Sequence, residues 1–255
     1  MLLAIDVGNT QTHFGLFRGP DLAEDWRMAT DREATGDALA AAYTALLGLR
    51  GLGFGDVDAA IVSSVVPQLT AAYESLSERY LGGMLAVVGP ALRSGMPIRI
   101  EKPHELGSDR LLNAVAALER YGGPCVVVDF GTTINYDAVS AEGEYLGGLI
   151  SPGVEISLEA LSTRAARLLK VDLEPPREVI GRSTEAAIRA GVVYGFAGAV
   201  DGIVRRVRRE LGEGTKALAT GGLAGSIVPF CEEIDAVEPY LTLTGLRLVW
   251  ERNRA

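Results

Sequence analysis

The sequence predicts an α/β protein made of two similar halves, each a mixed sheet flanked by helices. Two observations lead to this prediction. Apolar runs and amphipathic patterns in the first half follow the order strand, strand, strand, helix, strand, helix, strand. A hairpin with Asp, Gly and Thr at matched spacing begins each half, at Asp6–Thr10 and again at Asp129–Thr133. We therefore expect two domains, residues 1–120 and 121–255.

The composition indicates a globular protein. With 255 residues, 48% of them hydrophobic, the chain can bury one large core or two of ordinary size. The formal net charge of −9 argues against a nucleic-acid partner. No apolar stretch approaches the length that crosses a bilayer, and the N-terminal apolar run lacks the basic region of a signal peptide. We expect a cytoplasmic protein that binds no membrane.

The only cysteines are Cys125, in a predicted buried strand, and Cys231, so no disulfide framework is expected.

The first hairpin spans residues 2–16. An apolar run ends in Asp6, the turn Gly8-Asn9-Thr10 follows, and Phe14 and Leu16 then alternate with polar neighbours as a second strand. Glycine lets the backbone approach an anion, and successive N–H groups and hydroxyls form an anion-binding concavity. The carboxylate can hold a Mg²⁺ that accompanies phosphates. This turn is therefore a candidate phosphate site.

The other elements of the first half follow from apolar spacing and from helix end signals. Residues 90–107 are rich in Pro and Gly and form an irregular connection with a short strand at 98–100. Ser108 then serves as the N-cap of a helix that Gly122-Gly123-Pro124 ends. Before this connection we expect strands at 22–28, 59–62 and 84–88 and helices at 36–47 and 67–80.

The second hairpin, residues 125–139, repeats the pattern of the first. The match indicates a duplicated domain whose two hairpins face each other across a cleft and hold a nucleotide's phosphates from both sides. Two unrelated turns remain the alternative on spacing alone. The matched positions are Asp6 and Asp129, Gly8 and Gly131, Asn9 and Thr132, and Thr10 and Thr133.

The second half continues in the same way. A long helical pattern from Ser183 to Leu211 is interrupted by four glycines, where another helix could approach closely. The other expected elements are a strand at 145–150, a turn at 151–153, a helix through Leu168, a loop at 172–182, a strand at 217–219 and a terminal helix at 241–252.

The stretch 103–110 places charged residues and a histidine around a helix start, where backbone N–H groups favour anions. Asp109 there can accept a proton from a substrate hydroxyl, which is all that phosphoryl transfer needs from a base. Arg110 can hold a substrate carboxylate in a bidentate clamp. A capped helix start with a solvent-facing ion pair would explain the same residues.

The sequence lacks the residues that several other kinds of site require. His13 and His104 are the only histidines, so no histidine metal site is available, and His13 is expected on the solvent or cleft side of its strand. Neither a P-loop nor a G-x-S-x-G elbow occurs in the sequence. Thr220-Gly221-Gly222 could lie against a nucleoside or form a tight turn. The arginines at 205, 206, 208 and 209 are expected on a solvated helix face.

Taken in order, these motifs resemble the type III pantothenate kinases, which have the actin-like (ribonuclease H-like) fold of the sugar-kinase superfamily. The resemblance implies duplicated actin-like domains with an ATP cleft between them, and the ATP-dependent phosphorylation of pantothenate to 4'-phosphopantothenate, the first step of coenzyme A biosynthesis. It also implies a homodimer that needs Mg²⁺ and a monovalent cation, K⁺ or NH₄⁺. The motifs are D-V-G-N-T at 6–10, P-H-E-L-G-S-D-R at 103–110, D-F-G-T at 129–132, G-E-Y-L-G-G at 143–148, G-R-S-T at 181–184 and T-G-G-L-A at 220–224.

The resemblance also implies roles for individual residues. Asp109 would be the catalytic base, and Asp129 would ligate the monovalent cation. Asp6 would hold Mg²⁺, directly or through water. Thr184 would reach the pantothenate of the partner subunit. ATP would contact Asp6, Val7, Gly8, Asn9, Thr10, Gln11, Thr12, His13 and Thr132, and pantothenate would contact Ile100, Gly107, Ser108, Asp109 and Arg110.

The chain departs from the family pattern at a few positions. Ile100 replaces a usual Tyr, Ser108 replaces Ala, and residues 133–136 read T-I-N-Y where A-T-T-F is common. The aliphatic Ile134 would remove one hydrogen bond near the phosphates, so we expect an active kinase with a raised KM for ATP. A degenerate homologue, a regulatory or accessory protein, and another small-molecule kinase of the same superfold are the alternatives. The G-S-D-R helix start favours pantothenate over the last of these.

Overall fold

The computed structural model describes residues 1–89, 91–164 and 171–254, which form two compact units. The first unit comprises Met1–Met96, Lys102–Ala116 and Leu241–Ala255, and the second comprises Pro97–Glu101 and Ala117–Tyr240. This division differs from the expected domains 1–120 and 121–255 mainly at the C-terminal end. The terminal helix packs against the first two strands of the chain and therefore belongs to the first unit.

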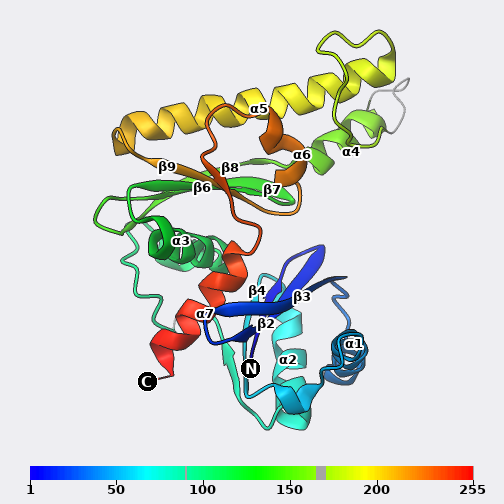
Figure 1. The fold of residues 1–255 in the computed structure, drawn as a ribbon, viewed down its shortest axis with the longest axis vertical. Coiled ribbons are helices and arrows are strands. Elements are labelled where there is room, and N and C mark those ends of the chain that lie inside the picture. The colour runs from blue at the N-terminus through cyan, green and yellow to red at the C-terminus, as the bar shows by residue number, and fades with distance from the viewer. Residues whose placement is uncertain (90, 165–170, 255) are drawn as a thin grey trace. The chain divides into compact units, whose positions relative to one another are not determined.

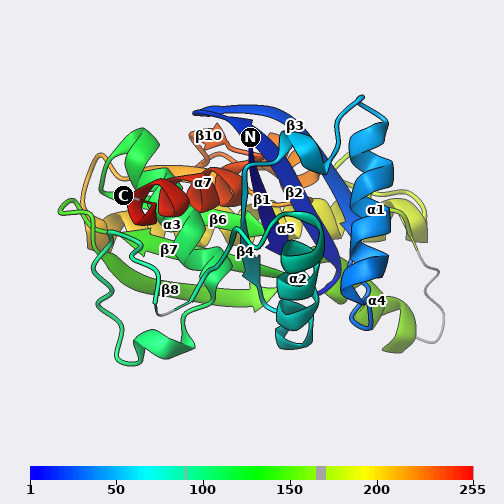
Figure 2. The ribbon, with the colours of Figure 1, turned by 90° about the horizontal axis from the view of Figure 1, so that it is seen from below.

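The sheet of the first unit has the strand order β3-β2-β1-β4-β5. β1 pairs antiparallel with β2 and parallel with β4. Helices α1 and α2 cover one face of this sheet (Figures 1 and 2), and α7 packs on the other. The bounds are β1 (Leu2–Val7), β2 (Gln11–Arg18), β3 (Asp21–Ala29), α1 (Gly36–Gly48), β4 (Ala59–Ser64), α2 (Pro67–Tyr80), β5 (Leu85–Val87) and α7 (Leu241–Asn253).

The core of the first unit lies between its sheet and α1 and α2. Alternate residues of β1 and β2 point into it, so Leu3, Ile5 and Phe14 are fully buried. The Phe14 ring lies 4.3 Å from the Tyr43 ring of α1, measured between centroids. Thr35 caps α1 by accepting a hydrogen bond from the Ala38 N–H at 3.2 Å. The strands and helices expected before residue 90 are confirmed.

The sheet of the second unit repeats the topology of the first, with the order β10-β9-β6-β7-β8. β6 takes the place of β1, because it pairs antiparallel with β7 and parallel with β9. The long helix α5 lies across one face of this sheet (Figure 1). The bounds are α3 (Ser108–Tyr121), which runs from the first unit into the second, β6 (Cys125–Phe130), β7 (Thr133–Val139), β8 (Tyr145–Pro152), α4 (Val154–Arg164), α5 (Thr184–Leu211), β9 (Lys216–Thr220), α6 (Ala224–Ile227) and β10 (Ala236–Val237).

Some expected elements need correction. The short strand at 98–100 is a single bridge between Ile98 and Tyr145. Ser151 and Pro152 belong to β8 rather than to a turn. The helix expected through Leu168 is described as far as Arg164, and Leu168 lies outside the described residues. The two-residue strand β10 and the one-turn helix α6 were not expected, because elements this short carry no periodicity.

Helix α5 corrects the expectation that no stretch is long and apolar enough to cross a bilayer. Among the described residues, its 28 residues alone pass that test, with a mean hydropathy of 1.4 over an 18-residue window. Core helices of soluble proteins pass it as well. In this chain Val193, Val200 and Val204 of α5 are fully buried in the core of the second unit. One face of the helix therefore packs against its own sheet.

Candidate functional site

Turn 1, Gly8–Gln11, joins β1 to β2. The register pairs Asp6 with His13 and Val7 with Thr12, and the Gly8 N–H donates to the Gln11 carbonyl at 3.0 Å. A Cβ atom on Gly8 would lie 2.8 Å from that carbonyl oxygen, so the turn requires glycine. Asn9, Thr10 and Gln11 are exposed. The backbone of this turn is thus open to a ligand.

Three of the expected ATP-binding residues have buried side chains. Val7 points into the core, and the Thr12 hydroxyl lies 3.0 Å from that of Thr30. His13 is 7% exposed, which corrects its expected place on the solvent or cleft side. Its Nε2 lies 2.9 Å from Asp25 Oδ2, and burial lowers the pKa of His13 although the hydrogen bond to Asp25 opposes that shift. Contacts of these residues with a nucleotide would have to come from their backbone atoms.

Turn 2, Gly131–Thr133, joins β6 to β7. Asp129 pairs with Asn135 and Phe130 with Ile134, so turn 2 is one residue shorter than turn 1. The Gly131 N–H donates to the Thr133 carbonyl at 3.0 Å, as the Gly8 N–H does in turn 1. Thr132 is exposed and Asp129 is half-buried at the end of β6. The expected repeat of the Asp-x-Gly turn is therefore present in both units.

The expected loss of a phosphate contact at Ile134 is wrong. The Ile134 side chain is 1% exposed and packs in the core of the second unit. Residues alternate across a strand, so the neighbouring Asn135 lies on the same face as Asp129. The Thr133 hydroxyl donates to Asn135 Oδ1 at 3.1 Å. A threonine at position 134 would place its hydroxyl in the core, away from turn 2.

The start of α3 lies at the same sheet edge as turn 1. Ser108 is the first helical residue rather than the expected N-cap, and its hydroxyl lies 2.8 Å from that of Ser63. Ser63 is the second-to-last residue of β4 and is in register with Asp6 of β1. The carboxyl ends of parallel strands are where α/β sheets bind ligands. The fold thus brings Asp109, which follows Ser108, to the edge where β1 delivers Asp6.

Gly107 precedes this helix and lies close to the Asp109 carboxylate. A Cβ atom at position 107 would lie 2.5 Å from Asp109 Oδ1. Gly107, Ser108, Asp109 and Arg110 are all half-buried, so a ligand could reach them. In this stretch a carboxylate and a guanidinium share the first turn of one helix, which suits a substrate that carries both a hydroxyl and an anionic group.

Two further expected substrate residues lie in the second unit. The Ile100 side chain packs close to Gly147, where a Cβ atom would come within 3.3 Å of Ile100 Cγ2. Thr184 is the exposed first residue of α5, and the Ser183 hydroxyl caps that helix by accepting from the Ala186 N–H at 3.1 Å. This end of α5 projects past the sheet of the second unit (Figure 1).

Gly221 belongs to the motif that was expected either to lie against a nucleoside or to form a tight turn, and it packs against the end of β6 next to turn 2. Its φ of +94° is a conformation that favours glycine, and a Cβ atom there would lie 2.5 Å from Asp129 Oδ1. Gly153 approaches the same turn, with a Cβ position only 2.2 Å from the Thr132 carbonyl oxygen. The backbone thus crowds both Asp129 and turn 2.

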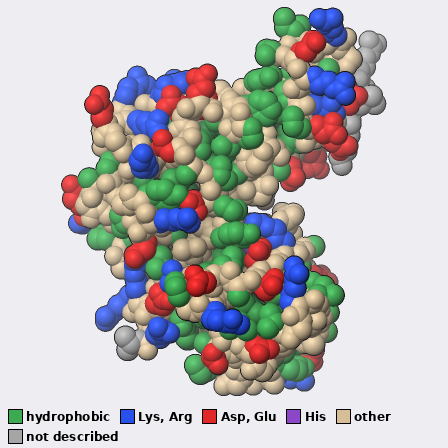
Figure 3. Space-filling view, in the orientation of Figure 1, with side chains coloured by type: hydrophobic (Ala, Val, Ile, Leu, Met, Phe, Trp, Pro, Cys, Tyr) green, Lys and Arg blue, Asp and Glu red, His purple; other side chains and the backbone are tan. Residues whose placement is uncertain are grey.

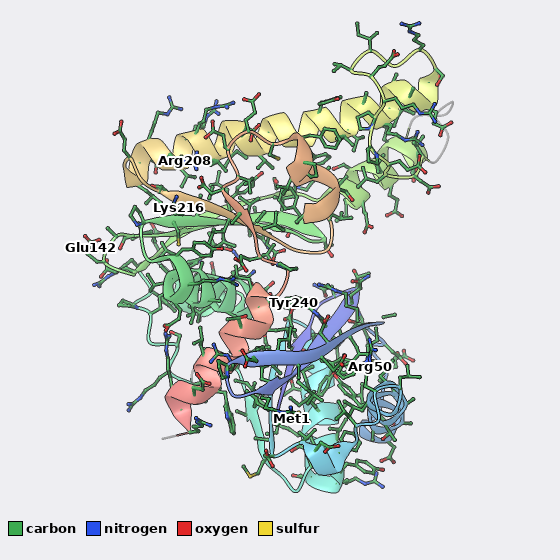
Figure 4. All side chains as sticks on the ribbon, in the orientation of Figure 1. Met1, Arg50, Glu142, Arg208, Lys216 and Tyr240 are labelled. Atoms are coloured by element: carbon green, nitrogen blue, oxygen red, sulfur yellow. The ribbon has the colours of Figure 1, made fainter. Side chains whose placement is uncertain are left out.

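The arginine cluster at the end of α5 is largely a solvated face, because Arg205, Arg206 and Arg209 are exposed. Figure 3 shows acidic side chains among the basic ones at this end of the second unit. Arg205 and Arg208 both pair with Glu233, and Arg208 also pairs with Asp235 at 2.8 Å. Arg208 and Lys216, labelled in Figure 4, line a hollow there. Acidic partners offset much of the basic charge, so this hollow is a weaker candidate than the edge near Asp6.

Within the described ranges, no three His, Cys, Asp or Glu side chains gather as a metal site. A cation at Asp6 or Asp129 would need further oxygen ligands from phosphate, backbone or water. Mg²⁺ commonly binds in this way, through one or two carboxylates and the phosphates of a substrate. The donor set around each turn therefore fits a hard cation that arrives with a nucleotide.

Comparisons with known proteins agree with these features. A family model described as type III pantothenate kinase matches residues 2–206. The type III pantothenate kinase of Streptomyces avermitilis is 51% identical over 261 residues, covering 99% of this chain and 98% of its own length. That of Frankia alni is 50% identical over 253 residues, covering 99% of this chain and all of its own length.

A solved structure of a Baf family protein from Campylobacter jejuni has a TM-score of 0.61 at 18% identity and covers 98% of both chains. A likeness at this identity shows the fold alone. The two mixed sheets with flanking helices are the actin-like architecture of ATPases and sugar kinases. Because the family model and these relatives span most or nearly all of the sequence, the chain belongs to the type III pantothenate kinase family.

Proposed function

We propose that this chain transfers the γ-phosphoryl group of ATP to pantothenate, giving 4'-phosphopantothenate, the first step of coenzyme A biosynthesis. Family membership supports the reaction. One observation of this chain carries the proposal: the Ser63–Ser108 hydrogen bond of 2.8 Å fixes the start of α3 beside the strand end that pairs with Asp6. The proposed base Asp109 and the proposed phosphate turn would thereby lie at one sheet edge of the first unit.

ATP would bind through the two glycine turns. Asp6 to His13 and Thr132 are the residues proposed to contact it, mostly through backbone N–H groups because several of their side chains are buried. The close approach of the Gly8 backbone to Gln11 supports a turn that presents main chain rather than side chains. Mg²⁺, when bound with ATP, would offset the phosphate charge, and Asp6 would hold it directly or through water.

Asp109 would accept the proton of the pantothenate hydroxyl as the new phosphate bond forms. The transition state of phosphoryl transfer is stabilised mainly by positioning and charge, so a fixed carboxylate suffices as base. Arg110 would pair with the pantothenate carboxylate, while Gly107 and Ser108 would offer backbone and hydroxyl contacts. Ile100 would supply apolar packing to the dimethyl region of the substrate.

We further propose that Asp129 binds a monovalent cation, K⁺ or NH₄⁺. The half-buried carboxylate stands at the end of β6 beside turn 2, where clustered phosphate charge would need an offset. Activity should therefore rise when K⁺ replaces Na⁺. Initial rates in the two chloride salts at equal ionic strength test this, and equal rates would refute the cation site.

The chain is also proposed to act as a homodimer in which Thr184 reaches the partner's pantothenate. On α5, Cβ atoms at Gly191, Gly195 and Gly198 would meet nothing within 4 Å, so a second helix could approach closely. Exposed apolar side chains accompany this region at Ile156, Leu161, Val179 and Ile180. An active monomer in light scattering at micromolar concentration would refute the shared site.

A cytoplasmic location without nucleic-acid or membrane partners remains a prediction. The acidic net charge of −9 supports the expected absence of a nucleic-acid partner.

The proposed reaction is tested by measuring ADP release, coupled to a dehydrogenase assay, with pantothenate, ATP, Mg²⁺ and K⁺. ADP release that depends on pantothenate supports the proposal. A folded protein that binds ATP without turnover would instead be the degenerate homologue.

A further inference from the structure

We propose that Thr30 and Arg32 are positioning residues of the nucleotide site, holding turn 1 in the shape that presents its N–H groups to phosphate. This inference rests on the proposed binding of ATP at turn 1. Neither residue belongs to the hairpin itself. Both lie just beyond β3, where the chain passes beside turn 1 before α1 begins.

Thr30 and Arg32 contact each of the three carbonyl oxygens at the tip of turn 1, those of Gly8, Asn9 and Thr10. The Thr30 hydroxyl donates to the Gly8 carbonyl at 2.8 Å, and the Thr30 N–H donates to the Thr10 carbonyl at 2.9 Å. Between them, Arg32 Nη2 donates to Asn9 Oδ1 at 3.2 Å and approaches the Asn9 carbonyl oxygen at 3.5 Å. Three successive peptide oxygens are thus turned toward residues 30 and 32.

The peptide geometry then fixes where the N–H groups point. In a trans peptide the C=O and the following N–H point in opposite directions. With its carbonyls held by residues 30 and 32, turn 1 directs the N–H groups of Asn9 and Thr10 to the other side. Within the part of the chain that the structure describes, these two N–H groups donate no hydrogen bond. They are the donors that an anion would take.

Thr30 is itself anchored in the core of the first unit. Its hydroxyl lies 3.0 Å from that of the buried Thr12, and the Tyr73 side chain lies next to Thr12. The Tyr73 hydroxyl in turn lies 3.2 Å from that of Tyr43. Burial raises the pKa of Tyr43 and that of Tyr73, so both phenols stay protonated and can donate. This chain of hydroxyls ties an exposed turn to a rigid interior.

Arg32 adds charge as well as geometry. Its guanidinium is exposed beside turn 1, on a chain with a formal net charge of −9 and no P-loop lysine. A polyphosphate at turn 1 would therefore meet a positive charge that is already held near Asn9. Arg32 thus serves both to hold the turn and to attract the nucleotide, while Thr30 only holds the turn.

The test uses four substitutions and two matched controls. Thr30→Val keeps the side-chain shape without the hydroxyl, and we expect the KM for ATP to rise about tenfold. Arg32→Ala should raise it about 10- to 100-fold, because a charged donor is lost. The kcat and the KM for pantothenate should change less than about twofold, since the chemistry at Asp109 is untouched. Thr30→Ser and Arg32→Lys should restore most of the affinity for ATP.

The controls separate positioning from general stability. Thr35→Val removes the cap of α1, and Arg50→Ala removes an exposed ion pair with Glu24 in the same unit. Neither should change the KM for ATP, although Thr35→Val should lower the unfolding temperature. Variants at 30 and 32 that change the KM for pantothenate as much as that for ATP would overturn the proposal, as would ATP affinities equal to the wild type.

Calorimetric titration with ATP, without pantothenate, distinguishes the two proposals. If the wild type binds ATP but does not turn over pantothenate, the proposed substrate is wrong, and weaker binding by Thr30→Val and Arg32→Ala still supports their positioning role. If the wild type binds no ATP, both proposals are overturned. If all variants bind ATP equally while pantothenate is phosphorylated, only the role of Thr30 and Arg32 is overturned.

Discussion

Turn 1 and turn 2 end equivalent strands of two sheets with the same strand order, yet different devices support them. Side chains support turn 1: the Thr30 hydroxyl holds the Gly8 carbonyl at 2.8 Å, and Arg32 holds Asn9. Backbone packing supports turn 2, because Cβ atoms at Gly153 and Gly221 would lie 2.2 Å from the Thr132 carbonyl oxygen and 2.6 Å from the Phe130 nitrogen.

The difference teaches which parts of a duplicated site are interchangeable. Both copies keep the antiparallel pairing, the carboxylate at the strand end and the glycine N–H that closes the turn. The supports are not repeated, because each turn meets a different neighbouring segment. Substitution of a hydroxyl or a guanidinium group can weaken its hydrogen bonds to turn 1 gradually. At a glycine packed against turn 2, any added side chain overlaps the neighbouring backbone.

The largest effect should come from Asp109→Asn, which separates chemistry from the two turns. Loss of the proposed base should lower kcat by roughly 10²-fold or more. Binding of ATP to the turns should stay nearly intact, because Asp109 lies on α3 and not on either hairpin. Single-turnover rates and calorimetry check the two parts, and an Asn variant with near-normal turnover would remove Asp109 from the mechanism.

Gly153→Ala should break turn 2 through a glycine outside its hairpin, whereas the supports of turn 1 outside its hairpin are the Thr30 and Arg32 side chains. The new methyl group would overlap the Thr132 carbonyl, so we expect a loss of stability of about 1–3 kcal/mol together with weaker ATP binding. Gly131→Ala is the control, since a Cβ atom there would lie at an ordinary 3.6 Å from Thr133 O. Denaturant unfolding of both variants checks the prediction. Equal stabilities would show that the crowding at Gly153 relaxes without cost.

Ile134→Thr should act on stability and not on ATP. The side chain is 1% exposed, so a hydroxyl there would be buried in an apolar core at a cost of about 1–3 kcal/mol. The KM for ATP should be unchanged at temperatures where the variant is folded. Thermal unfolding and initial rates test this. A lower KM for ATP would mean that residue 134 reaches the phosphates after all.

The smallest effect concerns pH and His13 near turn 1. Burial lowers the pKa of His13 from the usual 6.5, so the unfolded chain binds the proton more readily than the folded one. The contribution of His13 to stability is therefore complete above pH 6.5 and declines as the pH falls from 6.5 toward the lowered value. Urea unfolding of wild type and His13→Gln between about pH 7.5 and pH 5 should show a flatter profile for the variant. The exposed His104→Gln is the control, and a profile as steep in His13→Gln as in the wild type would contradict the assignment.

The sequence predicted the framework well because its signals are local. Alternation gave the hairpins around Asp6 and Asp129, and Pro67 and Ser183 marked helix starts that the structure confirms. The supports of the site could not be predicted, because Thr30, Ser63 and Gly153 matter only through residues far along the chain. The error at Ile134 has the same origin, since a motif alone does not say which face of a strand a side chain occupies.

The terminal helix shows a second limit. Its apolar pattern predicted α7, but nothing in residues 241–252 indicates that they pack beside β1 rather than with the preceding strand. Contacts between α7 and α3 supply the reason, because a Cβ atom at Gly245 would lie 2.2 Å from the Leu112 carbonyl oxygen. Such close packing of two helices is fixed by tertiary structure. For this reason a single boundary expected at residue 120 did not assign α7 to the first unit.

The proposed reaction is tested most directly by mass spectrometry of pantothenate incubated with ATP, Mg²⁺ and K⁺. With the wild-type chain, we expect pantothenate to gain one phosphoryl group at a rate that depends on enzyme concentration. The Asp109→Asn chain should give the same product at least about 10²-fold more slowly. A wild-type chain that is folded and binds ATP but leaves pantothenate unmodified at millimolar ATP would contradict the proposed reaction.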